Sequence, residues 1–275
     1  MDFLIVNGDI IPEKEVNLTP FLSDEPFVIS QKIWFGFGGI PLFNENIQSL
    51  INQLKALNIE IPEFLKNERE LFRVTKRMLN KNRFFKSGLL NIQLFINYGK
   101  IKYKIKAEPF NFQEFPFKKK GLIINVSNIH KDSSNSLYQY PFYNESNWRI
   151  AESRLKGLNF QNSVLLNENN MVCEGIRSNI FMIKDNVLVT PAMESGCFED
   201  TLRKPVLEVA NELKMKSMEL SNIKKEFLFE MNEVFFVSER KGIELILGIN
   251  NRRFVHLQSD NIYKKLNEYL NRKVN

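Results

Sequence analysis

The chain has 275 residues, of which 43% are hydrophobic and 25% charged, with 12 glycines and 10 prolines. This composition is typical of a globular protein, and it excludes a disordered chain, a collagen-like repeat and a disulfide scaffold. Lysine and arginine outnumber aspartate and glutamate by 38 to 32, a net charge of +6, but the basic residues are dispersed. Because no basic stripe with interleaved aromatic residues is present, the sequence predicts no nucleic-acid partner.

The N-terminal stretch and the cysteines indicate a cytoplasmic protein. No apolar run approaches the roughly 20 residues that a membrane helix needs, so we expect no membrane association. Residue 2 is an acid, and no basic region precedes the apolar stretch after it, as a signal peptide would require. The two cysteines, Cys173 and Cys197, are expected to be free buried thiols in a reducing compartment.

Residues 1–118 predict a domain of helices and strands. The segment 3–11 indicates a hairpin that turns at Asn7-Gly8. A helix is expected to begin near Asn44 as its N-cap, and a second to cover 68–80. Two strands within 89–110 are joined by a turn at Tyr98-Gly99-Lys100. The apolar face of the first helix comprises Ile47, Leu50, Ile51, Leu54 and Leu57.

Residues 121–275 predict a second, β-rich domain, which makes the fold class α+β. The run Lys118-Lys119-Lys120 suggests a solvated loop before a strand over 121–129. Helices are expected over 148–158, over 201–215 and at the C-terminus. Their buried faces are predicted to include Trp148, Ala151, Leu155 and Leu158 in the first, and Ile262, Leu266 and Leu270 in the last.

General motifs do not reveal a function. The sequence has no phosphate-binding loop, no dinucleotide-binding fingerprint and no cysteine or histidine pair at metal spacing, so no metal site is predicted. His130 and His256 lie far apart in the sequence and are expected to be structural or surface residues. From the residues alone, the chain is a mixed α and β protein of undefined activity.

One segment, 162–210, carries a resemblance to a known family. Its pieces are Glu174-Gly175, Ser178-Asn179-Ile180-Phe181, Thr190-Pro191, Gly196-Cys197 and Arg203. It is similar to the signature region of the class IV aminotransferases, the fold-type IV pyridoxal-phosphate (PLP) enzymes. These include branched-chain and D-amino-acid aminotransferases and aminodeoxychorismate lyase. Segments 40–54, 131–144 and 235–247 extend the resemblance over nearly the whole chain in the same order.

The resemblance implies a two-domain, D-amino-acid aminotransferase-like architecture, a site at the domain interface and a homodimer. It also implies a lysine that forms a Schiff base with the cofactor. With Ala151 matched to the helix alanine of the family, that lysine falls at Pro141. Lys131 and Lys156 are the two candidate replacements for it.

The phosphate-binding elements also differ from the family pattern. Asp200-Thr201-Leu202 stands for Gly-Ile-Thr, and Glu239 stands for a late Thr or Ser. Carboxylates at these positions oppose a phosphate, which prefers hydroxyl groups and free backbone N–H groups. Near the N-terminus, Ser30 to Trp34 replaces Phe-Glu-Thr-x-Arg, and Asn46 and Ser49 replace a histidine and an arginine. These substitutions predict that PLP is not retained.

Three hypotheses follow for function. The favoured one is a repurposed enzyme or pseudoenzyme that binds an anionic metabolite through Arg177, Arg203, Arg240 and Asn179. In it, Glu174, which matches the family's partner of the pyridine nitrogen, or Glu239 could act as a general acid or base. The second is an active aminotransferase or aminodeoxychorismate lyase with a displaced lysine. The third is an interaction protein whose old pocket is filled by Trp34, Phe142 and Tyr143.

Overall fold

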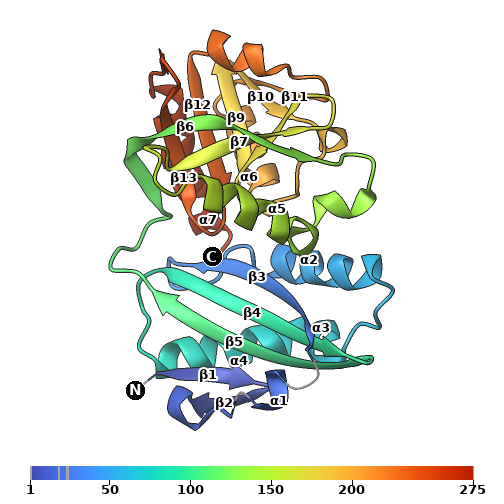
Figure 1. Cartoon of the computed structure of the whole chain (residues 1–275). Helices are drawn as coiled ribbons and strands as arrows, with labels where there is room; N and C mark the ends of the chain where they lie inside the picture. Colours follow the sequence, from blue (N-terminus) through green and yellow to red (C-terminus); the bar gives the residue numbers. More distant parts are fainter. Residues whose placement is uncertain (1, 18, 23–24, 275) are drawn as a thin grey trace. The chain divides into compact units, whose positions relative to one another are not determined.

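The computed structural model of the chain describes residues 2–17, 19–22 and 25–274 (Figure 1). The chain divides into two compact units, Met1–Phe115 with Leu270–Asn275, and Pro116–Tyr269. Residues 270–275, which are predicted to belong to the second domain, fall in the first unit. Leu270 is buried, and Lys273 forms an ion pair of 3.3 Å with Glu45.

The first unit is an antiparallel sheet with helices packed on it. Its strands lie in the order β2-β1-β5-β4-β3, and side chains of the sheet, α2 and α4 share one apolar core. The strands are β1 (Phe3–Val6), β2 (Asp9–Pro12), β3 (Phe27–Phe35), β4 (Gly88–Asn97) and β5 (Lys100–Pro109). The helices are α1 (Thr19–Leu22), α2 (Phe43–Ala56), α3 (Glu63–Lys66) and α4 (Glu68–Lys81), with a 3-10 turn at Glu13–Glu15.

The predicted hairpin of the first unit is confirmed. Val6 pairs with Asp9, and Asn7 and Gly8 both have positive φ, at 48° and 105°, as a tight hairpin turn requires. The prediction that Asn44 caps α2 is wrong, because α2 begins at Phe43 and its N-cap residue makes no side-chain hydrogen bond. Phe43, the first residue of α2, is buried in the apolar core, whereas Asn44 is exposed.

The second unit is built on a mixed sheet. Among the described residues, the strand order is β11-β10-β9-β12-β13-β6-β7-β8, with β14 paired to β13. The strands are β6 (Phe117–Lys131), β7 (Asn162–Asn167), β8 (Val172–Gly175), β9 (Asn179–Lys184), β10 (Val187–Pro191), β11 (Lys216–Leu220), β12 (Glu233–Ser238), β13 (Gly242–Ile249) and β14 (Arg252–Arg253). The helices are α5 (Pro141–Arg154), α6 (Arg203–Glu212) and α7 (Gln258–Arg272), of which residues 270–272 belong to the first unit. The 3-10 turns are at Ser136–Gln139, Met193–Ser195 and Lys225–Glu230.

Three predictions for the second unit need correction. Residues 118–120 are exposed as expected, but they belong to β6 and not to a loop, because β6 pairs with β13 from Phe117 onwards. Helix α5 begins at Pro141, seven residues earlier than predicted. It ends before Gly157, whose φ is +80°, so Leu158 is 52% exposed and not part of the buried face.

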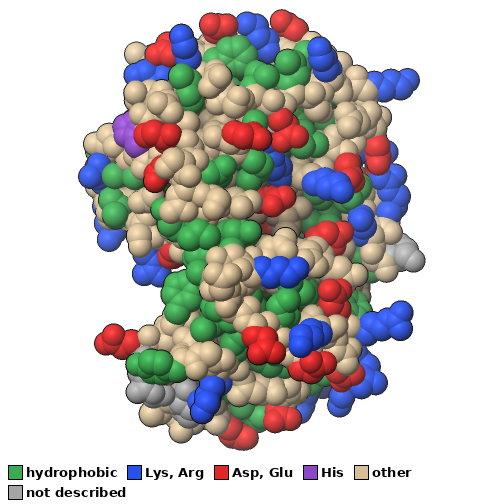
Figure 2. Space-filling model, turned by 90° about the vertical axis from the view of Figure 1, so that its right-hand side faces the viewer, with side chains coloured by type: hydrophobic (Ala, Val, Ile, Leu, Met, Phe, Trp, Pro, Cys, Tyr) green, Lys and Arg blue, Asp and Glu red, His purple; other side chains and the backbone are tan. Residues whose placement is uncertain are grey.

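Charged side chains are spread over the surface. Figure 2 shows lysine, arginine, aspartate and glutamate interspersed on the visible face, in line with the dispersed charges of the sequence. No helix in the described part of the chain is long and apolar enough to cross a membrane.

Candidate functional site

Lys131 and Glu174 lie beside the small apolar core that α5 forms with the sheet of the second unit. In β6, Ile129 packs in a small apolar core with Trp148 of α5, and Lys131 shares the face of Ile129 because side chains alternate along a strand. Glu174 of β8 lies directly opposite Leu165 of β7, a member of the same core. The pairing of the strands therefore brings a lysine and a glutamate into an apolar environment.

Glu174 is fully buried, and both its carboxylate oxygens are engaged. The indole Nε1 of Trp148 donates to Oε1 at 2.7 Å. The backbone N–H of Phe198 donates to Oε2 at 2.7 Å, and the Lys131 ammonium lies 2.7 Å from the same oxygen. A buried carboxylate is tolerated only when it is paired and hydrogen-bonded, and the ion pair with Lys131 and the two hydrogen bonds from Trp148 and Phe198 meet that condition.

Lys131 is as deeply buried as its partner. Its side chain is 1% exposed, against 0% for Glu174. The Lys131 ammonium is within ion-pair distance of the Glu174 carboxylate. It makes no hydrogen bond of good geometry to any group in the described residues, so the pair is held by the attraction of opposite charges. Lys131 is one of the two lysines that the sequence offers as replacements for the Schiff-base lysine. The other, Lys156, is exposed beyond the end of α5.

The loop before α6 is organised by the Asp200 side chain. Its carboxylate accepts the backbone N–H of Leu202 at 2.9 Å and that of Glu239 at 3.2 Å. Burial raises the pKa of Asp200 to about 6, although the two N–H groups act in the opposite direction. Glu239 is itself buried, and its carboxylate accepts the hydroxyl of Thr201. Backbone amides from two distant segments therefore converge on one carboxylate.

Asn179 connects this loop to the Glu174 cluster. Its Nδ2 donates to the carbonyl of Phe198 at 2.8 Å, and its Oδ1 accepts the N–H of Asp200 at 3.3 Å. The predicted ligand residue Asn179 thus holds the segment 198–200 in place from within the protein.

Arg177 is already committed to protein partners. It is bound by Glu145 and by Glu152, the latter at 3.0 Å, and lies 5.3 Å from the ring centre of Trp148. Its guanidinium is therefore not available as predicted for a small anion.

Arg203 and Arg240 differ in their exposure to solvent. Arg203 is buried and donates to Thr190 Oγ1, to the Pro191 carbonyl and to Glu219. Arg240 is exposed on the turn between β12 and β13. Of the three predicted arginines, Arg240 is the one that the structure presents to solvent.

The remaining candidates do not form a second site. Burial raises the pKa of Cys173 far above its ordinary value and that of Cys197 to about 11, so neither is a ready nucleophile. His130 is exposed, with Nε2 3.1 Å from Asn170 Oδ1, and burial lowers the pKa of His256. No group of three or more metal-ligating side chains occurs in the part of the chain that the structure describes.

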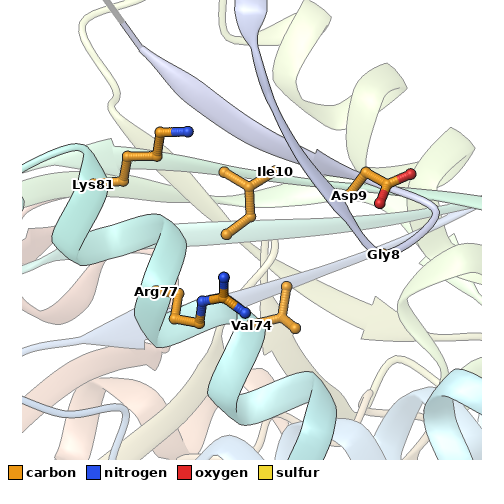
Figure 3. A pocket seen from close by; sticks show the side chains of 6 residues that line it. All are labelled: Gly8, Asp9, Ile10, Val74, Arg77 and Lys81. Carbon is orange, nitrogen blue, oxygen red and sulfur yellow. The ribbon is translucent and has the colours of Figure 1, made fainter.

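A pocket of about 320 Å³ lies in the first unit, between α4 and the β1–β2 hairpin (Figure 3). Arg77 and Lys81 extend from α4 toward Ile10, and Asp9 points away from both. All of these charged side chains are exposed, as on an ordinary solvated helix face, so the pocket does not define a site.

Comparison with known proteins decides the family. The model of the family described as "Amino-transferase class IV" matches residues 36–243. The chain belongs to the class IV aminotransferase family. Two known proteins with different activities are similar to this chain in sequence. A probable branched-chain-amino-acid aminotransferase of Aquifex aeolicus is 23% identical, covering 98% of this chain and 91% of its own. Aminodeoxychorismate lyase of Bacillus subtilis is 24% identical, covering 76% and 74%.

Solved structures of branched-chain aminotransferases share the fold. The branched-chain aminotransferase of Thermoproteus uzoniensis with norvaline has a TM-score of 0.86 at 20% identity, over 99% of this chain and 95% of its own. The enzyme of Thermobaculum terrenum in its PLP form has a TM-score of 0.85 at 18% identity, over 99% and 94%. The α+β, fold-type IV architecture predicted from the sequence is thereby confirmed.

Sequence reasoning missed several parts of the site. It did not identify Trp148 and the Phe198 N–H as donors to Glu174, or the Asp200 carboxylate as an acceptor of backbone N–H groups. For Lys131 a signal was present, because extending the predicted strand by two residues past Ile129 places Lys131 on the same face. The other contacts depend on loops that only the folded chain brings together.

Proposed function

We propose that this class IV family member has lost Schiff-base chemistry and works without PLP, as a repurposed enzyme or pseudoenzyme that binds a small anionic metabolite. The observation that carries the proposal is the environment of Glu174. The resemblance assigns this acid to the pyridine nitrogen, yet Lys131, Trp148 and the Phe198 N–H already engage both of its oxygens.

The residues present do not fit the cofactor. Position 141, where the resemblance requires the Schiff-base lysine, is the proline that begins α5. The backbone N–H groups of Leu202 and Glu239, suited to a phosphate, are directed at the Asp200 carboxylate.

Support for an anionic ligand is confined to one turn. Arg240 is exposed between β12 and β13, next to Lys241, which is partly buried. Glu239, the residue before them, is the proposed acid or base, and its carboxylate would first have to leave the Thr201 hydroxyl. Arg177 and Arg203 are withdrawn from the proposed ligand set, because each is held by protein partners.

The test is a visible absorption spectrum of the purified chain with added PLP, before and after borohydride reduction. We expect no aldimine band and no reduced adduct on any peptide. A band that borohydride fixes to a peptide would contradict the proposal.

The alternative is an active PLP-dependent aminotransferase or aminodeoxychorismate lyase in which Lys131 is the displaced lysine. The observation in its favour is that Lys131 is buried beside Glu174, as a Schiff-base lysine would have to be. Against it, the ammonium lies at the acid assigned to the ring nitrogen, which is across the ring from the aldehyde carbon. An adduct on the peptide of Lys131, lost in Lys131→Met and retained in Lys156→Met, would establish this alternative.

We further propose that the chain is a homodimer, as the family resemblance implies. Sedimentation equilibrium is expected to give about twice the monomer mass of 32.3 kDa. A mass equal to that of one chain at micromolar concentration would refute the dimer.

A further inference from the structure

We propose that Lys131 and Asp200 are built-in substitutes for the two charged ends of PLP, so that the chain closes its ancestral cofactor site with its own side chains. This inference rests on the proposed function above and explains how the cofactor is excluded. All the residues involved lie in the second unit.

The first substitute provides the cation. A protonated pyridine nitrogen offers a carboxylate one positive N–H donor, and the Lys131 ammonium offers Glu174 the same charge at 2.7 Å. Both side chains are shielded from water, and a buried carboxylate needs one positive charge beside it. The Lys131 ammonium supplies that charge. A ring nitrogen could bind Glu174 only by leaving the ammonium unpaired in the interior.

The second substitute provides the anion. Backbone N–H groups at the start of α6 and at the β12–β13 turn point to one place, an arrangement that binds phosphate oxygens. The Asp200 carboxylate fills that place, with N–H contacts of 2.9 Å from Leu202 and 3.2 Å from Glu239. The resemblance puts glycine at position 200, where no side chain would compete with a ligand.

The two substitutes are linked rigidly. Phe198 donates its N–H to Glu174, and Asp200 lies two residues further along the same loop. Asn179 binds the carbonyl of Phe198 and the N–H of Asp200, so one amide side chain fixes both ends. We assign Asn179 as a positioning residue for the closed site.

The experiment opens the site by substitution and measures binding of pyridoxamine 5′-phosphate by calorimetry. This probe has the ring nitrogen and the phosphate but no aldehyde, so its binding needs no lysine. The opened variant is Lys131→Met with Asp200→Gly and Glu239→Thr, the last to remove a second carboxylate beside the amides. We expect it to bind the probe at least about tenfold more tightly than the unmodified chain.

Partial variants assign the effect to the two substitutes. Restoring Lys131, or restoring Asp200, in the opened variant should weaken binding of the probe by about tenfold or more. Glu239→Thr alone should gain no binding. The matched control is Lys184→Met with Asp185→Gly, which changes the same residue types at the β9–β10 turn, where the Lys184 side chain is 40% exposed. It should bind the probe no better than the unmodified chain.

Loss of Lys131 leaves Glu174 buried without a counter-charge and could prevent folding. A second test therefore keeps the ion pair. In Asp200→Gly with Glu239→Thr, inorganic phosphate followed by phosphorus NMR should bind about tenfold more tightly than to the unmodified chain. A folded variant without this gain would overturn the substitution at the anion end.

The outcomes separate the inference from the proposed function. If the opened variant folds and does not bind the probe, the inference fails while the proposed function stands. If the unmodified chain binds the probe as tightly as the opened variant, its site is not closed and the inference also fails. A borohydride-fixed PLP adduct on the unmodified chain would overturn both.

Discussion

Asp200 is the residue through which pH should act most strongly on stability. Its pKa is raised by burial from an ordinary 3.8 to about 6, although the backbone N–H groups of Leu202 and Glu239 act to lower it. Between about pH 4 and pH 6 the folded chain therefore binds more protons here than the unfolded chain. The contribution of Asp200 to stability falls as pH rises through that window and stays low above it.

Asp200→Asn removes this titration and keeps an oxygen for the Leu202 N–H. The stability of the variant relative to the unmodified chain should be greater at pH 7 than at pH 4.5. The full pKa shift would give about 2 kcal/mol, and we expect about 1 kcal/mol because the side chain is partly exposed. Urea unfolding at the two pH values measures the difference. The control is Asp185→Asn, in an exposed turn, and an equal response of the two variants would contradict the prediction.

Arg177 should affect stability and not ligand binding. Arg177→Gln leaves Glu145 and Glu152 without their shared partner, and we expect a loss of about 1–2 kcal/mol in urea unfolding, since the glutamates are partly solvated. Burial pushes the pKa of Glu145 up, but Arg177 and Arg149 hold it below its ordinary value, so the variant should raise it. In the control Arg149→Gln, the arginine is 72% exposed, and the loss should be below about 0.5 kcal/mol. An unchanged stability with reduced anion binding would restore the ligand role.

At the level of elements, α5 illustrates what the sequence does and does not contain. Its later half was predicted from the apolar spacing of Trp148 and Ala151, which are both buried. Its start was missed because the polar stretch before it has no apolar period. Two local features mark that start. Pro141 occupies the first turn, and the side-chain amide of Asn144 donates a hydrogen bond to the carbonyl of Tyr140. By contrast, the Asn7-Gly8 turn has a specific backbone requirement, and it was predicted from two residues.

Pro141→Lys tests whether the lost lysine alone accounts for the lost chemistry. Proline at the first helical position gives up no hydrogen bond, so its replacement should cost less than about 1 kcal/mol of stability. We expect no aldimine band with PLP, because Lys131 and Asp200 still occupy the charged ends of the site. Pro141→Ala is the control for the helix start. A borohydride-fixed adduct at residue 141 would show that the site is open.

For the whole molecule, the resemblance predicted the order of elements from residue 40 to residue 247, and the family match over 36–243 agrees. It did not place residues 270–275 with the first unit. A terminal helix shows from its apolar period which face is buried, but not which distant residues cover its last turn. The residues that cover the last turn are chosen by the fit of surfaces far apart in the sequence. At Gly39, for example, the Val274 side chain fills the space that a Cβ atom would need.

The contact between the C-terminus and the first unit can be measured with a double-mutant cycle. A methyl group at residue 39 would come within 2.4 Å of Val274 Cγ1, so Gly39→Ala should destabilise the full chain by about 1–3 kcal/mol. Deleting residues 270–275 removes the buried Leu270 side chain and should cost about 2–4 kcal/mol. In the shortened chain Gly39→Ala should cost almost nothing, because its clashing partner is gone. Additive losses in urea unfolding would mean that the last six residues do not pack on Gly39 in solution.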